Sequence, residues 1–284
     1  MSSLAHERVG IVGLGAIGGS LALALREHAS SIAWSRDQAD RTAAEGAGLR
    51  VSREDGASWL SDFANATVLV IAVPLDEIAS VARASLPVLP NDSLVLHVGS
   101  LQRHDALGLS DAESRRVLGT HPIAGSERSG FAAATAAMFQ GATVRAEARA
   151  TEAERRRIEA LWGAAGVEHL VWGDAADHDD LMSWVSHLPQ LTATALAAAL
   201  GQRGITARDA GPGARDLTRL ASSDLTMWRP ILSKASAETP TALRCIGGIL
   251  ESLASAIEAG DHIRIATSWE KAQVWRRRIA EKRA

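Results

Sequence analysis

One histidine, His121, stands inside a stretch of glycines and hydroxyl side chains at positions 119–130, which read GTHPIAGSERSG. Loops of this composition fix side chains near the mouth of a sheet, where ligand sites commonly form. Imidazole exchanges protons near neutral pH, so this stretch is a candidate for proton-transfer chemistry.

Two further stretches carry polar residues that could bind a small acid. Positions 186–190 read SHLPQ, and positions 211–219 read GPGARDLTR. Arg215 and Arg219 are four residues apart, so on a helix they share a face. Two arginines on one face beside a glycine-rich turn could hold a dicarboxylate.

A third stretch, positions 13–18, reads GLGAIG and matches G-x-G-x-x-G directly after an apolar run. Gly13 allows a tight turn, Gly15 lets the backbone approach a pyrophosphate, and Gly18 lets helix and strand pack closely. This context predicts dinucleotide binding, and the alternative is a glycine-rich turn without a ligand. The predicted cofactor contacts here are Gly13, Gly15, Ala16, Ile17 and Gly18.

The residues after the next apolar run bear on the choice between NAD and NADP. That run, at positions 31–34, is followed by Ser35 and Arg36 rather than by the acidic residue that usually binds a ribose 2′-hydroxyl. A hydroxyl and a guanidinium suit a 2′-phosphate, and Arg41 could add charge. Asp37 keeps NAD as the alternative, because it could bind a ribose hydroxyl if the turn is shifted. We predict NADP.

Strand and helix signals alternate along the first part of the chain. Continuous β-branched runs mark strands buried on both faces, as in a parallel sheet covered by helices. The alternation predicts an α/β, doubly wound Rossmann domain over residues 1–173. The expected strands are 8–12, 31–34, 66–73, 93–98, 142–148 and 167–171, and the expected helices are 20–28, 38–46, 76–84 and 151–165.

Residues 174–284 show a different pattern, in which Ala/Leu-rich segments are separated by glycine and proline. This pattern predicts an all-α domain. Pro189 should kink its first helix or mark an irregular start. The expected helices are 177–201, 224–235, 239–259 and 262–282.

Composition narrows the class of protein. A formal net charge of −3 argues against a nucleic-acid binder. A single cysteine fits a reducing compartment and excludes a cysteine-rich zinc cluster. We find neither a secretory signal pattern nor an apolar run long enough for a membrane span, so we expect a cytoplasmic protein.

Several motifs occur in a fixed order: GLGAIGGSLALAL, AVP, VGS, GTHPIAGSERSG, the HD pair within 177–179, SHLP, RDxTR and SSDxxMWR. In this order and spacing the chain resembles the prephenate/arogenate dehydrogenase (cyclohexadienyl dehydrogenase) family of tyrosine biosynthesis. The resemblance covers about residues 9–231. It implies a Rossmann domain followed by an all-helical domain that forms a homodimer.

The resemblance implies an oxidative decarboxylation of arogenate or prephenate. A hydride leaves the ring carbon that bears the 4-hydroxyl and goes to the nicotinamide, and the ring carboxylate departs as CO2. Because the ring becomes aromatic, decarboxylation is favourable and no metal is required.

The matching positions also imply residue roles. His121 matches the catalytic histidine, which accepts the hydroxyl proton, and Ser100 matches a serine that bonds the same hydroxyl. The alternatives are a structural loop histidine and a strand-end turn serine. The 284 residues contain no tyrosine, so no phenol is available for either task.

Other matching positions imply binding roles. Arg219 matches the carboxylate-binding arginine and Arg215 a nearby cation, with an exposed helical ion pair as the alternative. His187 matches the SHLP histidine on the substrate side, although a buried core histidine is also consistent. We expect His178 and Asp179 to shape the start of a helix. The remaining implied contacts are Ser126, Glu127 and Gln190 for the substrate and Val73 and Pro74 for the cofactor.

Two departures affect these roles. Gln190 stands where many family members have a second histidine, near the end of the substrate that carries a keto acid in prephenate and an amino acid in arogenate. Losing a potentially cationic group weakens a prephenate preference, so we lean to arogenate. His97 and Gln102 stand where the family often has Asp and Lys, so those two roles do not transfer.

Several readings compete with an NADP-dependent arogenate dehydrogenase. Within the family they are a prephenate dehydrogenase that uses NAD and a cousin acting on 4-amino-4-deoxyprephenate. Outside it they are a β-hydroxyacid dehydrogenase or an imine reductase, which lack the HPIAGSE and RDxTR blocks. A non-catalytic NADP-sensing protein would need the glycines but neither His121 nor Arg219.

Overall fold

The computed structural model describes residues 4–54, 58–125, 128–206 and 208–281. The chain divides into two compact units, and each is described by itself. The sequence-based division after residue 173 follows the last strand, whereas the compact units group the next helix and a later one with the sheet. The first unit is Met1–Met182 with Ser222–Ser236, and the second is Ser183–Ala221 with Ala237–Ala284.

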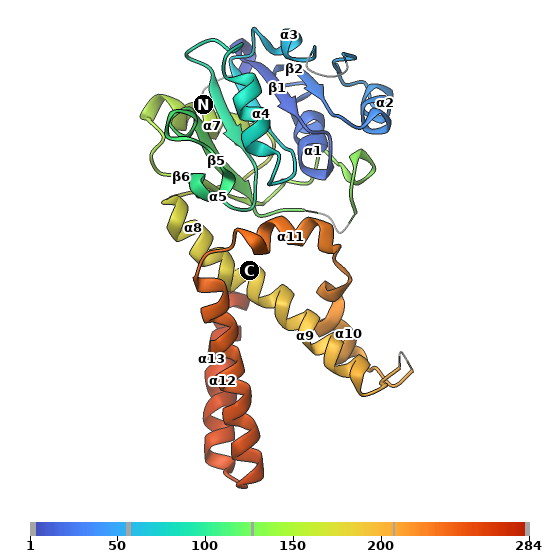
Figure 1. Ribbon diagram of the computed structural model, residues 1–284, viewed down its shortest axis with the longest axis vertical. Coiled ribbons are helices and arrows are strands. Elements are labelled where there is room, and N and C mark those ends of the chain that lie inside the picture. The colour runs from blue at the N-terminus through green and yellow to red at the C-terminus, as the bar shows by residue number, and fades with distance from the viewer. Residues whose placement is uncertain (1–3, 55–57, 126–127, 207, 282–284) are drawn as a thin grey trace. The chain divides into compact units, whose positions relative to one another are not determined.

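Within the described residues, the first unit holds a seven-stranded sheet in the order β2-β1-β3-β4-β5-β6-β7 (Figure 1). The first five strands in this order are parallel to one another, β6 runs antiparallel to β5, and β7 runs parallel to β6. The strands are β1 (Arg8–Val12), β2 (Ser30–Trp34), β3 (Val68–Ile71), β4 (Leu94–His97), β5 (Val117–Pro122), β6 (Thr143–Glu147) and β7 (His169–Gly173).

Helices lie along both faces of this sheet. Val68 and Val70 of β3 belong to one buried cluster with residues of α1 and α7, while Leu69 and Ile71 belong to a second cluster with residues of α3 and α4. A strand covered on both faces must be apolar at every position, as β3 is. The helices of this unit are η1 (Leu4–His6), α1 (Ala16–Leu25), α2 (Gln38–Gly46), α3 (Leu60–Phe63), α4 (Ile78–Ser85), α5 (His104–Leu107), α6 (Asp111–Ser114), η2 (Phe131–Ala133), α7 (Glu152–Ala164), α8 (Ala175–Met182) and α11 (Leu225–Ser233).

The α/β class predicted from the sequence is confirmed, and the six predicted strands are present with shifted ends. The sequence analysis missed β5, the strand that carries His121. Its residues read VLGTHP, and the glycine and polar side chains hide it among loop signals. The reversal of β6 and β7 was also not predicted, because strand direction depends on connections rather than on local composition.

The second unit is helical. Ser183–His187 forms a π-helical turn (η3) just before Pro189. This turn is the irregular helix start that the sequence analysis expected from Pro189. α12 and α13 are long and pack side by side (Figure 1). The other helices are α9 (Leu188–Gln202), α10 (Pro212–Thr218), η4 (Arg219–Ser222), α12 (Glu238–Glu258) and α13 (His262–Glu281), and η4 ends just past the boundary with the first unit. Among the described residues, no helix is both long and apolar enough to cross a bilayer.

Candidate active site

The turn after β1 has a backbone that requires glycine. Gly13 takes φ = 102°, and a Cβ there would stand 2.2 Å from the carbonyl oxygen of Ala72, after β3. A Cβ on Gly18 would stand 1.9 Å from the carbonyl oxygen of Gly13. The turn and the first turn of α1 are therefore packed too closely for any side chain at these two positions.

Gly15 leaves the amino end of α1 open. It is the N-cap residue, it supplies no side-chain cap, and no described atom lies within 4 Å of where its Cβ would stand. The first backbone N–H groups of a helix lack intrahelical partners and carry a partial positive charge. Those of Ala16 and Ile17 lie in this first turn. A pyrophosphate group fits this cradle, because a dinucleotide needs both open space and N–H donors here.

The residues after β2 divide into two kinds. The Asp37 carboxylate accepts a hydrogen bond of 2.7 Å from the backbone N–H of Ala39 and caps α2, so it is engaged in holding that helix. The Ser35 hydroxyl accepts from the N–H of Asp37 at 3.2 Å. Arg41 is buried and donates to the Ser35 carbonyl oxygen. Arg36 is exposed and pairs with Glu77, which directly precedes α4.

Four predicted site residues lie at or just after the carboxyl ends of neighbouring parallel strands. Val73 and Pro74 come after β3, Ser100 comes after β4, and His121 lies near the end of β5. Val73 is half-buried and Pro74 is exposed, and Ser100 and His121 are half-buried. Open α/β sheets bind ligands at this edge, so the fold gathers these residues where chemistry is expected.

His121 belongs to a chain of three ionisable side chains. Its Nδ1 lies 3.0 Å from Nε2 of His178, and His178 Nδ1 lies 2.8 Å from Oδ1 of Asp179. The Asp179 carboxylate also accepts the backbone N–H of Gln102 at 2.7 Å and of Arg103 at 3.1 Å. His178 and Asp179 are 3% and 1% exposed, so the chain runs from a half-buried imidazole into the core.

This arrangement determines which nitrogen of His121 is basic. A carboxylate only accepts hydrogen bonds, so Nδ1 of His178 carries its proton and Nε2 of neutral His178 is an acceptor. His121 must then donate from Nδ1, and its Nε2 carries the lone pair that can receive a proton. A buried carboxylate at the far end stabilises the positive charge that such a transfer creates.

A second buried polar cluster supports β5. The Glu147 carboxylate accepts the N–H of Gly119 at 2.7 Å and contacts His104 Nε2 at 2.9 Å and Arg149 Nη2 at 3.1 Å. Burial acts to raise the pKa of Glu147, but these hydrogen bonds and the Arg149 charge outweigh burial and lower it. This ionised carboxylate fixes the strand two residues before His121.

His97, at the end of β4, is fully buried, and burial lowers its pKa to about 4. Its Nδ1 accepts the N–H of Gly99 at 3.3 Å, and its Nε2 has no hydrogen-bond partner among the described residues. His97 is therefore a neutral histidine at neutral pH.

Two predicted site residues lie in the second unit as buried, hydrogen-bonded side chains. His187 Nδ1 is 3.0 Å from the Thr239 hydroxyl, and the Gln190 amide donates to the Leu220 carbonyl oxygen at 2.8 Å. His187 is 1% exposed and Gln190 is 7% exposed. Both therefore hold α9 in place, whatever else they contact.

The two arginines are exposed. Arg215 lies in the last turn of α10 and donates from Nε to the Ala210 carbonyl oxygen at 3.1 Å. Arg219 is the C-cap of α10, with helical φ = −53° and ψ = −42°. The helical path therefore continues through Arg219, and the two guanidinium groups start one turn apart.

The sequence analysis missed part of this site. Two of the residues that it predicted are not among the residues that the structure describes. It expected His178 and Asp179 to shape the start of a helix, and they do lie within α8, but it missed that they also link to His121. The signal available was a pair of adjacent titratable residues on the buried side of a helix. Ser126 and Glu127 lie outside the described residues. No group of three His, Cys, Asp or Glu side chains in the described part of the chain could hold a metal ion.

Comparison with protein families identifies the chain's relatives. Residues 21–156 match the model "Prephenate dehydrogenase, nucleotide-binding domain", and residues 174–268 match "Prephenate dehydrogenase, dimerization domain". The chain belongs to the prephenate dehydrogenase family. The glycine turn lies just ahead of the first matched segment.

Named members of this family are distant in sequence. A prephenate dehydrogenase of Bacillus subtilis is 29% identical over 232 residues, which are 78% of this chain and 62% of that protein. A cyclohexadienyl dehydrogenase of Zymomonas mobilis is 26% identical over 265 residues, 90% of both chains. The chain thus spans less than two thirds of the Bacillus protein.

Solved structures of the family share the fold. Prephenate dehydrogenase from A. aeolicus, in complex with hydroxyphenyl propionate and NAD+, superposes with a TM-score of 0.87 at 24% identity and covers 98% of this chain and 100% of its own. Arogenate dehydrogenase from Synechocystis gives 0.78 at 22% identity, over 96% and 99% of the two chains.

Proposed function

We propose that this protein oxidises and decarboxylates arogenate, with prephenate as the related substrate, and passes the hydride to NADP in tyrosine biosynthesis. The observation that carries the proposal is the chain from His121 through His178 to Asp179, at the same sheet edge as an open helix terminus suited to a dinucleotide. A protein that only sensed NADP would need the glycine turn but not this buried relay.

The residues divide the chemistry as follows. When bound, NADP supplies the hydride acceptor. His121 accepts the proton of the substrate 4-hydroxyl at Nε2, and the His178–Asp179 pair holds the tautomer and stabilises the imidazolium. Ser100 hydrogen-bonds the same hydroxyl. Loss of CO2 then follows because it makes the ring aromatic.

Substrate binding is assigned to the second group of predicted residues. Arg219 pairs with a substrate carboxylate and Arg215 adds positive charge. His187, Gln190, Ser126 and Glu127 complete the proposed set of substrate contacts. We propose that residues 174–284 form the substrate-binding and dimerisation domain.

The preference for NADP rests on the residues after β2. Asp37 caps α2, which makes it a poor acceptor for a ribose hydroxyl, while Ser35 and Arg36 suit a 2′-phosphate. The preference for arogenate rests on Gln190, an uncharged amide where a cation would favour the keto acid. Steady-state titrations of both cofactors and both substrates test these choices, and a higher kcat/KM for NAD or for prephenate would contradict them.

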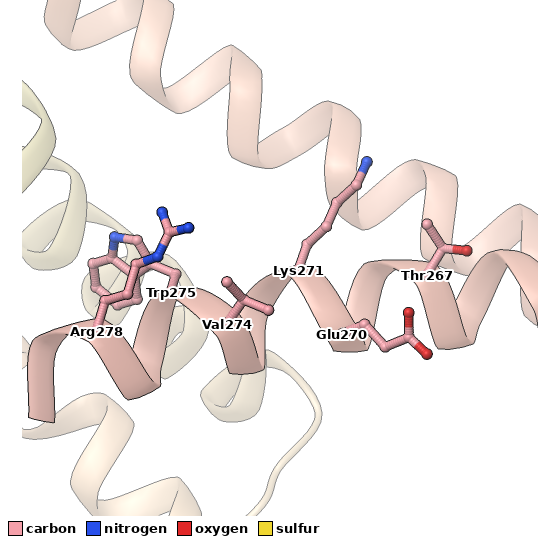
Figure 2. Close-up of a pocket in the computed structure, with 6 residues that line it drawn as sticks. All are labelled: Thr267, Glu270, Lys271, Val274, Trp275 and Arg278. Carbon is pink, nitrogen blue, oxygen red and sulfur yellow. The ribbon is translucent and has the colours of Figure 1, made fainter. Parts of the chain in front are cut away.

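We further propose a cytoplasmic homodimer built on the helical unit. Its long helices expose large apolar side chains that water disfavours, and the family model for this region is a dimerisation domain. Figure 2 shows one face of α13, where Val274 and Trp275 lie between charged residues. The exposed apolar residues of α12 and α13 are Ile249, Leu250, Ile257, Ile263, Trp269, Val274, Trp275 and Ile279.

A further inference from the structure

An ion pair bridges the two sides of the cofactor turn. Arg36 follows β2, Glu77 follows β3, and β1 lies between these strands in the sheet. Nη2 of Arg36 lies 2.9 Å from Oε1 of Glu77. The bridge therefore joins the two elements that flank the end of β1, where the glycine turn begins.

The backbone ties both ends of this bridge to the turn. The N–H of Gly13 donates to the Trp34 carbonyl oxygen at 2.7 Å, two residues before Arg36. On the other side, a Cβ at Gly13 would stand 3.1 Å from the backbone nitrogen of Val73. The N–H of Glu77 then donates to the Pro74 carbonyl oxygen at 2.9 Å and fixes the turn that presents Glu77.

The Glu77 carboxylate is not used to stabilise its own helix. Glu77 is the N-cap of α4 but makes no side-chain cap hydrogen bond. Its side chain is 33% exposed, and that of Arg36 is 78% exposed. The carboxylate is thus directed to the guanidinium that the proposed function assigns to the 2′-phosphate of NADP.

We propose that Glu77 is a specificity-determining residue. Its carboxylate weakens the binding of NADP and so reduces the preference of the protein for NADP over NAD. This inference rests on the proposed cofactor site. A ribose 2′-phosphate carries between one and two negative charges at neutral pH, so it must displace Glu77 from Arg36 and is repelled by the released carboxylate. The 2′-hydroxyl of NAD carries no charge and can donate a hydrogen bond to that carboxylate. Arg36 favours NADP and Glu77 favours NAD, so the two residues together determine the ratio of the two affinities.

The size of the effect follows from the exposure of the pair. Exposed ion pairs are weak and are screened by salt, so NADP can break this one. Removing the carboxylate charge should increase the ratio of NADPH to NADH affinity by about 3- to 10-fold, more at low salt than at high salt.

Titration calorimetry with NADPH and NADH on the full chain tests the proposal without any turnover. We compare the unmodified protein with Glu77→Gln. Glu45→Gln serves as the matched control, because the Arg53–Glu45 pair is a 2.8 Å bridge with side chains 85% and 33% exposed, at the opposite end of α2. Glu77→Gln should raise the affinity ratio, while Glu45→Gln should leave it unchanged.

A double variant shows whether Glu77 acts through Arg36. In the Arg36→Ala background, Glu77→Gln should lose the part of its effect on the NADPH affinity that comes from competition for Arg36 and keep only the part that comes from repulsion between the carboxylate and the phosphate. An unchanged affinity ratio in Glu77→Gln, with both cofactors still bound, would overturn the role of Glu77 but not the proposed function. Failure of the unmodified protein to bind either cofactor would instead overturn the proposed function.

Discussion

Nδ1 of His121 lies 3.0 Å from Nε2 of His178, on a helix 57 residues further along the chain. Because His178 is tied by its other nitrogen to the buried carboxylate of Asp179, the two imidazoles have one consistent pattern of protons. The basic nitrogen of His121 is then Nε2. In the proposed mechanism, His178 and Asp179 are therefore positioning residues, which act through His121.

Replacing His178 should damage catalysis without weakening cofactor binding. In His178→Gln the imidazole link between His121 and the Asp179 carboxylate is lost, so the tautomer of His121 is no longer fixed and kcat should fall by about 100-fold or more. The dissociation constant for NADPH should stay unchanged, because neither His178 nor Asp179 lies in the glycine turn. Steady-state kinetics and titration calorimetry with NADPH measure the two effects.

Asp177→Asn is the control for this experiment, because Asp177 is exposed on the same helix. It should leave the kinetics near those of the unmodified protein. A normal kcat in a folded His178→Gln protein would remove the His178–Asp179 pair from the mechanism.

Stability should decline as the pH falls below neutral. The pKa of His97 is lowered by burial from 6.5 to about 4 in the folded protein, so between these values the unfolded chain binds the extra proton. The free energy of unfolding should then fall by about 1.4 kcal/mol per pH unit through this window. Above it His97 contributes no slope, and Glu147, whose pKa is lowered from 4.5, adds its own loss of stability only as the pH falls below about 4.5.

Urea unfolding at several pH values measures this slope. His97→Asn keeps an acceptor for the N–H of Gly99 but cannot titrate. The slope of its unfolding free energy against pH, between pH 4 and 6.5, should therefore be smaller by about 1.4 kcal/mol per pH unit, the contribution of one proton. Equal slopes for the two proteins would show that His97 is not the group that titrates.

Removing Arg219 should affect the substrate far more than the cofactor. A lost charge-assisted hydrogen bond to a carboxylate predicts that Arg219→Ala raises the substrate KM by about 10- to 100-fold. Arg203, an exposed arginine at the end of α9, provides the control Arg203→Ala. If both variants raise the substrate KM equally, the effect is general charge rather than a specific contact.

The apolar face of α13 predicts how the protein assembles. Trp275 is 64% exposed, so Trp275→Glu should raise the dimer dissociation constant by about 30-fold or more if a second chain covers it. Ala153→Glu, on the exposed side of α7, adds the same charge to the first unit. Sedimentation velocity should show dissociation for the first variant alone, and a monomeric unmodified protein would contradict the proposal.

Local signals were enough to predict part of the fold and site. The glycine turn could be predicted because Gly13 and Gly18 are required by contacts within one strand-turn-helix unit. The capping box of α7 was visible for the same reason, since Thr151 and Glu154 are three residues apart and bond each other's backbone.

Features that depend on tertiary packing could not be predicted. His121 and His178 meet only because β5 and α8 are brought together, and nothing in either local pattern specifies that contact. The competing use of Asp37 as a helix cap was likewise unresolved until the start of α2 was known. Long-range pairings and strand directions therefore had to come from the structure.

The most direct test of the account is a spectrophotometric assay of cofactor reduction, at about 340 nm, with arogenate or prephenate as the substrate. The account predicts NADPH formation with release of one CO2 per hydride transferred. It also predicts that His121→Asn lowers turnover by about 100- to 10,000-fold while still binding NADPH. Absence of reduction of either cofactor with either substrate, or near-normal turnover in His121→Asn, would contradict it.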